Sequence, residues 1–175
     1  ERKMKDKNGL AAINETRSRI NAIALVHRGL YEGDDLRYID MEVFLGRLTH
    51  ELGFALGADK LGIDIHTQSN CEPLEADTAT PVALFVVEAL TNSIKHGVSG
   101  GGTVHISLTQ DKTNICIQVQ DSGAGFDGAG KHEGMGSKLI RGFARQLSGT
   151  IDEANTGEGY VISLSFKHRP YSNPI

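Results

Sequence analysis

Apolar side chains recur with a helical period in the first third of the chain. Two sets of positions, each spaced by seven residues, trace a narrow seam: Ile13, Ile20 and His27, and Thr16, Ile23 and Leu30. This repeat predicts one helix over residues 9–31, packed in a hairpin or a dimeric bundle. Gly33-Asp34-Asp35 ends it, and a second helix is predicted from the N-cap Asp40 onward. The apolar face of that second helix is Met41, Phe44, Leu45, Leu48, Leu52 and Leu56.

From Leu61 onward, apolar and polar residues alternate, which is typical of half-buried strands. Ile63 and Ile65 predict one strand, and a short extended piece follows near Leu74. Two hairpins are predicted beyond it, with strands at 104–108 and 115–119 around the turn 111–114, and at 149–153 and 160–166 around the turn 157–159.

Two helices are expected between these strands. Thr80 followed by Pro81 predicts a helix that runs to about His96 and ends at Gly97. A second amphipathic helix is expected to open at Lys138 and to close at Gly149. Antiparallel strand pairs with helices between them predict the α+β class, as a two-layer α/β sandwich.

Composition narrows the function classes. The chain has 175 residues, a formal net charge of −4 and 39% hydrophobic residues, as in an ordinary folded protein. A mildly acidic balance argues against a nucleic-acid or membrane-surface binder, which needs clustered Lys and Arg. Cys71 and Cys116 form no CxxC pair and are interpreted as small buried hydrophobes in a reducing cytosol. The first residue is Glu1 rather than Met, so we expect a piece of a longer protein.

A glycine-dense stretch follows the strand that ends at Asp121. Gly123, Gly125 and Gly128 satisfy G-x-G-x-x-G, but residues 129–134 do not start the helix that a dinucleotide fold requires. Residues 125–132 nearly spell a P-loop, but His132 stands where Ser or Thr should bind magnesium. Both matches are therefore interpreted as chance products of glycine density.

Another set of residues fits better. Glu88, Asn92 and Lys95 are spaced +4 and +3, which places them on one helical face. By itself that stripe also fits an ordinary solvated face. Asp121 with its following glycines would allow close approach to a flat ligand, and residues 134–137 would offer free backbone N–H groups to an anion at a helix start.

These motifs resemble those of the ATPase family that histidine kinases share with gyrase and MutL. Residues 88–96 resemble its N box, residues 121–126 its first glycine box, residues 134–139 its second, and residues 157–159 its final glycine turn. The resemblance covers residues 61–167 and implies a Bergerat-type ATP-binding fold, with a mixed, mostly antiparallel sheet and helices on one face.

The resemblance also implies roles for single residues. Asp121 would accept a hydrogen bond from the adenine amine, and Asn92 would ligate Mg²⁺. Glu88 would act as the catalytic base, toward water or the acceptor histidine. The remaining nucleotide-binding residues would be Lys95, His96, Gly123, Gly125, Gly134, Gly136 and Ser137.

The front of the chain resembles the second dimerisation helix of the HWE-like sensor histidine kinases, through residues 19–31 and Ile39-Asp40. No H-R-x-x-N box is present, so the phosphoacceptor histidine is expected upstream of Glu1, and His27 is interpreted as a packing residue of the seam. We expect three parts: a helical dimerisation and phosphotransfer region at 1–57, the ATP-binding domain at 58–169 and a tail at 170–175.

The resemblance thus implies the core of a two-component sensor kinase, which moves the γ-phosphoryl group of ATP to a histidine and then to a response-regulator aspartate. Its partners would be a response regulator and a second copy of the chain, in the cytoplasm, without nucleic acid or direct membrane contact. The alternatives are a phosphatase or phosphotransfer scaffold on the same fold that does not use ATP as a kinase, and an anti-sigma-type serine kinase.

Overall fold

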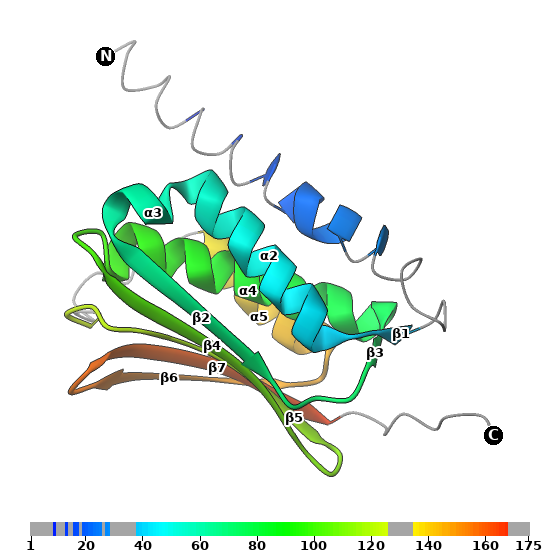
Figure 1. Ribbon diagram of the computed structural model, residues 1–175. Helices are drawn as coiled ribbons and strands as arrows, with labels where there is room; N and C mark the ends of the chain where they lie inside the picture. Colours follow the sequence, from blue (N-terminus) through cyan, green and yellow to red (C-terminus); the bar gives the residue numbers. More distant parts are fainter. Residues whose placement is uncertain are drawn as a thin grey trace.

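The computed structural model describes residues 38–125 and 135–167, together with residues 9, 13, 16, 17, 19–25, 27 and 28. Its elements are, in chain order, β1 (Tyr38–Ile39), α2 (Met41–Leu56), α3 (Ala58–Leu61), β2 (Ile63–Ser69), β3 (Leu74–Glu75), α4 (Ala76–Asn92), η1 (Ser93–Gly97), β4 (Gly102–Asp111), β5 (Asn114–Asp121), α5 (Met135–Gln146), β6 (Thr150–Thr156) and β7 (Gly159–Lys167). One face of a five-stranded sheet carries the helices α2, α4 and α5 (Figure 1). The predicted two-layer sandwich is confirmed.

The sheet has the order β2-β4-β5-β7-β6, in which only the β2–β4 pair is parallel. Both predicted hairpins are present, as β4–β5 and β6–β7. Alternate residues of the three central strands are buried against the helices, which is why the strands show a period of two. The buried set includes Val104, Ile106, Leu108, Ile115, Ile117, Val119, Ile162, Leu164 and Phe166.

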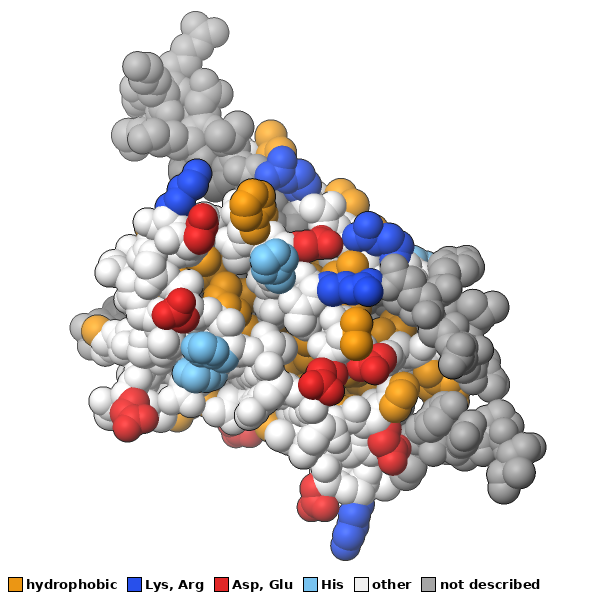
Figure 2. Space-filling view, viewed as in Figure 1, with side chains coloured by type: hydrophobic (Ala, Val, Ile, Leu, Met, Phe, Trp, Pro, Cys, Tyr) orange, Lys and Arg blue, Asp and Glu red, His pale blue; other side chains and the backbone are white. Residues whose placement is uncertain are grey.

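The outer face of the sheet is polar. His66 and His105 are register partners on β2 and β4, and their rings stack with centroids 4.9 Å apart. They line a shallow hollow of about 330 Å³ together with Gln118 and Gln120 of β5. On the face shown in Figure 2, acidic and basic side chains are interspersed.

Helix α2 forms as predicted from Asp40. The Asp40 side chain caps it by accepting hydrogen bonds from the backbone N–H groups of Glu42 (2.9 Å) and Val43 (3.1 Å). Gly57 ends it in the left-handed conformation, at φ 72°. The helix packs against β2 and α4, with its predicted apolar face inward.

Helix α4 begins at Ala76, so the predicted start at Pro81 is wrong. Pro81 lies inside the helix, where it has no N–H to donate to the carbonyl of Asp77. Burial of Ala79 and Pro81 keeps this first stretch helical, and the Thr80 hydroxyl donates to the Ala76 carbonyl at 2.7 Å. The predicted end at Gly97 is confirmed, but the last five residues form the π-helical turn η1, in which Val98 N donates to Ser93 O at 2.8 Å.

Helix α5 begins at Met135, three residues before the predicted start at Lys138. Gly136 is part of its first turn and lies directly against α4, so that a Cβ there would come within 3.1 Å of Glu88 Oε2. Packing of α5 on α4 therefore extends the helix into a stretch that is too rich in glycine to be helical by propensity.

All described residues between 9 and 28 are helical, in agreement with the predicted helix. Its inward side carries Ala22 and Leu25, which join the core. The predicted seam faces outward: Ile13 and Ile20 are 64% and 60% exposed. Residues 29–31 of the prediction, including Leu30, lie outside the described residues. No helix in the described part of the chain is both long and apolar enough to cross a bilayer.

The cysteines are free, but they are half-buried rather than buried, which corrects their interpretation as buried hydrophobes. Cys71 lies between β2 and β3, where its thiol donates to Gln110 Oε1 at 3.2 Å. Burial, with a smaller contribution from the negative charge of Glu72, raises the pKa of Cys71 from 9.0 to about 11.

We expect Cys71 to be alkylated slowly. At pH 8 a pKa of 11 leaves about a hundredth of the thiolate that a pKa of 9.0 would give, so alkylation in a Cys116→Ser chain should be about 100-fold slower than that of a small exposed thiol. Equal alkylation rates would contradict the shielding of Cys71.

The Cys71 thiol loses its proton at a lower pH in the unfolded chain than in the folded one. Folding stability should therefore fall as the pH rises from 9 toward 11.

Candidate active site

Asp121 is held in a tight backbone cradle at the end of β5. Its carboxylate is 2% exposed, and its Oδ1 accepts a hydrogen bond from Gly123 N at 3.0 Å. A Cβ added at Gly97 would lie 2.5 Å from Asp121 Oδ2, and one added at Gly123 would overlap the carbonyl of Gly97. The end of η1, the carboxylate and the loop after β5 are therefore in direct contact, and only glycine fits at both positions.

The next strand closes the cradle. Tyr160 on β7 is the register partner of Asp121, and Gly159 before it has φ 136°. A Cβ at Gly159 would overlap the carbonyl of Asp121, which explains the glycine in the motif 157–159. Burial and then the neighbouring Glu153 raise the pKa of the Tyr160 phenol, so this ring stays neutral beside the carboxylate.

A second group lies where α4 meets the start of α5. Glu88 is 6% exposed although it is charged, and its Oε2 is 3.1 Å from the Cβ position of Gly136. Asn92, one turn later and exposed, has its amide group 3.8–3.9 Å from the same position. The buried acid, the exposed amide and the first turn of α5 thus meet at the Cβ position of Gly136.

An arginine for which the sequence predicted no role in the site completes this group. Arg19, on the N-terminal helix, donates from Nε to Glu88 Oε1 (2.5 Å) and from Nη2 to Glu88 Oε2 (3.0 Å). It lies three residues before the buried Ala22, on the same inward side of its helix. The sequence held one signal for this contact: Arg19 has helical spacing with Ala22 and Leu25, so its charged side chain shares their inward side.

The remaining residues that were predicted to bind the nucleotide do not gather as closely as Glu88, Asn92 and Gly136 do. Lys95 and His96 lie exposed in η1, and the α-helical spacing assumed for Lys95 does not hold there, because a π turn holds more residues than an α turn. Gly125, at φ 83°, faces Asn155 of β6, whose Oδ1 is 2.9 Å from its Cβ position, and Asn155 was not predicted. Ser137 lies half-buried in α5, whereas Gly134 lies outside the described residues.

Among the residues that the structure describes, no three His, Cys, Asp or Glu side chains gather as a metal cluster. The donor set at Asn92 nevertheless suits Mg²⁺, which prefers oxygen ligands and keeps most of its waters or takes substrate phosphates. An exposed amide oxygen beside a buried carboxylate fits a magnesium ion that is held mainly by its substrate.

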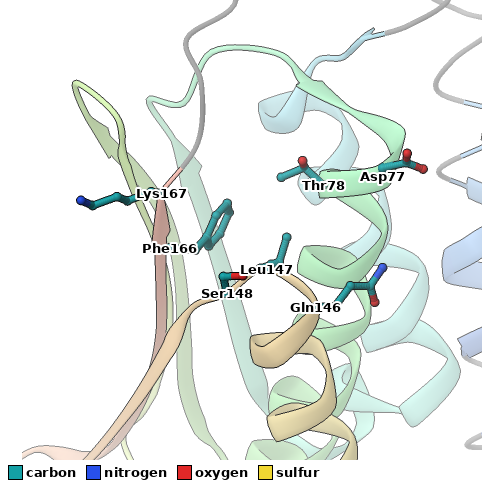
Figure 3. A pocket seen from close by; sticks show the side chains of 7 residues that line it. All are labelled: Asp77, Thr78, Gln146, Leu147, Ser148, Phe166 and Lys167. Carbon is teal, nitrogen blue, oxygen red and sulfur yellow. The ribbon is translucent and has the colours of Figure 1, made fainter.

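A separate cavity of about 560 Å³ lies at the opposite end of the same elements. Figure 3 shows it between the start of α4, the end of α5 and the end of β7, with Phe166 and Leu147 directed toward the space and Lys167 directed away from the helices. At 1.5 Å per helical residue, the length of α4 and η1 puts about 25–30 Å between Asp77 and Gly97. This cavity is therefore no part of the candidate site.

Comparisons with known proteins agree with this geometry. Residues 65–166 match the family model of the histidine kinase-like ATPase domain, and residues 1–55 match a histidine kinase model. Among curated proteins, the chain is 24% identical over 157 residues to blue-light-activated histidine kinase 2 of Erythrobacter litoralis (strain HTCC2594), covering 83% of the chain and 44% of that protein. It is 23% identical over 178 residues to the sensor histidine kinase PdtaS of Mycobacterium tuberculosis, covering 96% of the chain and 35% of that protein. The chain thus spans less than half the length of these relatives.

Solved structures share the fold. The histidine kinase domain of the Erythrobacter litoralis EL346 blue-light-activated histidine kinase aligns with a TM-score of 0.72 at 20% identity, over 87% of this chain and 74% of that one. The catalytic domain of the histidine kinase ThkA aligns with a TM-score of 0.58 at 20% identity, over 73% of this chain and 95% of that one.

Proposed function

The chain belongs to the histidine kinases that carry a histidine kinase-like ATPase domain, and on that premise we propose that it is the ATP-binding catalytic core of a two-component sensor kinase. It would transfer the γ-phosphoryl group of ATP to a histidine, from which the group passes to a response-regulator aspartate. The observation that carries this proposal is the buried Asp121 carboxylate, enclosed by glycine backbone at Gly97, Gly123 and Gly159.

That cradle suits the recognition of adenine. One carboxylate oxygen is engaged by Gly123 N, and the carboxylate has no donor hydrogen of its own when ionised. An ionised carboxylate accepts hydrogen bonds only, so it favours the exocyclic amine of adenine over the carbonyl at the same position of guanine. Glycine at 123 and 125 would let the flat base approach the backbone.

The second group would hold and orient the phosphates. The early start of α5 puts Gly136 and Ser137 into the first turn, where unpaired backbone N–H groups attract anions, and Gly134 would precede them. Asn92 would be the protein ligand of Mg²⁺, which would supply positive charge against the phosphates. Lys95 and His96 in η1 would contact the nucleotide from the exposed side.

Glu88 is the proposed catalytic base. It is buried beside Asn92 and Gly136, next to the proposed phosphate position, and so could take a proton from the group that attacks the γ-phosphorus. The acceptor histidine is proposed to lie upstream of residue 1. His27 is exposed in the single chain, on the side that carries Ile13 and Ile20.

The same exposed seam supports the proposal of a homodimer through the helical segment, with a receiver domain as the second partner. We propose the division into a helical region at 1–57, an ATP-binding domain at 58–169 and a tail at 170–175, which agrees with the two matched ranges. A cytoplasmic location is proposed because the reaction uses ATP and the cysteines are free.

Calorimetric titration with Mg²⁺-ATP tests the adenine site. In Asp121→Asn, Oδ1 can still accept from Gly123 N, but an amide donor replaces the other oxygen and would oppose the adenine amine. We expect affinity to fall about 10- to 100-fold, in line with the roughly 1–3 kcal/mol cost of an unsatisfied buried group. Asp152→Asn, on the exposed part of β6, is the matched control and should bind like the unmodified chain.

Equal affinity of Asp121→Asn and the unmodified chain would remove Asp121 from the adenine site. Absence of binding by the folded, unmodified chain would overturn the kinase proposal, and the chain would then be interpreted as a scaffold that docks a response regulator.

A further inference from the structure

The pair formed by Arg19 and Glu88 joins two distant parts of the chain at the proposed catalytic base. The residues are 69 positions apart, and the arginine engages both carboxylate oxygens. The side chains are only 20% and 7% exposed, so water screens the pair little. A two-point contact between a guanidinium and a carboxylate is among the stronger polar contacts in proteins.

This contact opposes the role proposed for Glu88. A base needs an oxygen with a free lone pair directed at the proton that it takes. Here Arg19 holds both oxygens, and the first turn of α5 lies on the Oε2 side at Gly136. The chain as it stands therefore presents a neutralised and occupied base.

The described residues of the N-terminal helix bury only a small apolar surface. Among its described residues, only Ala22 and Leu25 are buried in the core, while Ile13 and Ile20 face outward. A second ion pair of its described residues, between Arg28 and Glu51 of α2, is 3.9 Å long, and the two side chains are 61% and 52% exposed. Exposed pairs of this kind contribute little, so the contact of Arg19 with Glu88 is the stronger of these two ion pairs.

We propose that the Arg19–Glu88 ion pair is an autoinhibitory latch. The ion pair holds the N-terminal helix against α4 and occupies the Glu88 carboxylate, so that Glu88 cannot accept a proton. A shift of that helix frees the carboxylate for proton transfer. The latch rests on the proposed function, because it regulates the same base. It gives the helix control over catalysis without any change in the adenine cradle, which lies at the other end of η1.

The test compares the unmodified chain with Arg19→Gln, Arg19→Lys and Arg28→Gln. Loss of γ-phosphate from radiolabelled ATP is measured as free plus protein-bound phosphate, and Mg²⁺-ATP affinity is measured by calorimetry in parallel. If the latch leaves about one molecule in ten competent, Arg19→Gln should raise turnover about tenfold. Arg19→Lys keeps the charge but not the two-point contact, so its increase should be smaller. Arg28→Gln, which breaks the exposed pair of the same helix, should change nothing.

Two additional readouts separate the latch from misfolding and from failure of the proposed function. Melting temperatures show that each variant is folded. Amide hydrogen exchange at residues 19–25 should accelerate most in Arg19→Gln, less in Arg19→Lys and not at all in Arg28→Gln. Turnover in Arg19→Gln that is unchanged or lower, with ATP binding intact, overturns the latch and leaves the kinase proposal standing. Failure of every variant to bind Mg²⁺-ATP overturns both.

Discussion

Replacing Glu88 by glutamine is expected to slow the loss of γ-phosphate from ATP, measured as free plus protein-bound phosphate, about 10²- to 10⁴-fold, the range typical of losing a positioned general base. Glutamine has nearly the same shape as glutamate, so it should keep its place between α4 and Gly136. It cannot take a proton, so the chemical step should slow. Mg²⁺-ATP affinity should stay within a few-fold, because the adenine contacts at Asp121 are not involved.

The loss of charge in Glu88→Gln also weakens the contact with Arg19, so the substitution is best made both in the unmodified chain and in the Arg19→Gln chain. The Arg19→Gln chain and the double variant both lack the ion pair, so any gain from releasing the helix is common to them. The difference in turnover between these two chains therefore reports the loss of the base alone. Glu51→Gln is the matched control, since it removes the acid of the exposed pair with Arg28. If Glu88→Gln leaves the rate of γ-phosphate loss within threefold, both in the unmodified chain and in the Arg19→Gln chain, Glu88 is excluded as the base.

Substitution of Gly123 by alanine is expected to abolish measurable ATP binding and to destabilise the fold by about 3 kcal/mol, the upper part of the range for overpacking. Its Cβ would overlap the carbonyl of Gly97, and both atoms belong to the backbone or are fixed to it, so no side-chain rotation relieves the overlap. Moving Gly97 away would also separate η1 from Asp121. Stability and binding should therefore fall together.

Chemical denaturation and calorimetry measure these two effects. Gly100→Ala serves as the control, because Gly100 lies in the turn after η1 and a Cβ there meets nothing within 4 Å. It should retain both stability and binding. If Gly123→Ala binds ATP as tightly as Gly100→Ala, the close contact between the loop after β5 and η1 is not part of the nucleotide site.

The π turn η1 explains how one helix serves both groups of the site. Glu88 and Asn92 lie on the regular part of α4, facing α5, whereas Gly97 at the end of η1 faces the Asp121 carboxylate on the sheet. The π turn η1 lies between these two contacts along the chain. One continuous segment thus connects the proposed base to the proposed adenine site.

Several features of this protein could be read from the sequence because they depend on near neighbours in the chain. Burial of one sheet face imposes a period of two on β4, β5 and β7, and Asp40 caps α2 through its own side chain. The pairing of Glu88 with Asn92 follows from α-helical geometry. The need for glycine at 123 and 159 was visible as a motif, although the backbone contacts that require it were not.

The tertiary structure alone decided the rest. The starts of α4 and α5 moved to Ala76 and Met135 because packing outweighs the local preferences of Pro81 and Gly136. The contacts of Arg19 with Glu88 and of Asn155 with Gly125 join residues 69 and 30 positions apart. The spacing of residues within one element can show that a side chain such as Arg19 faces inward, but it does not show which partner the side chain meets, because that depends on how whole elements come together.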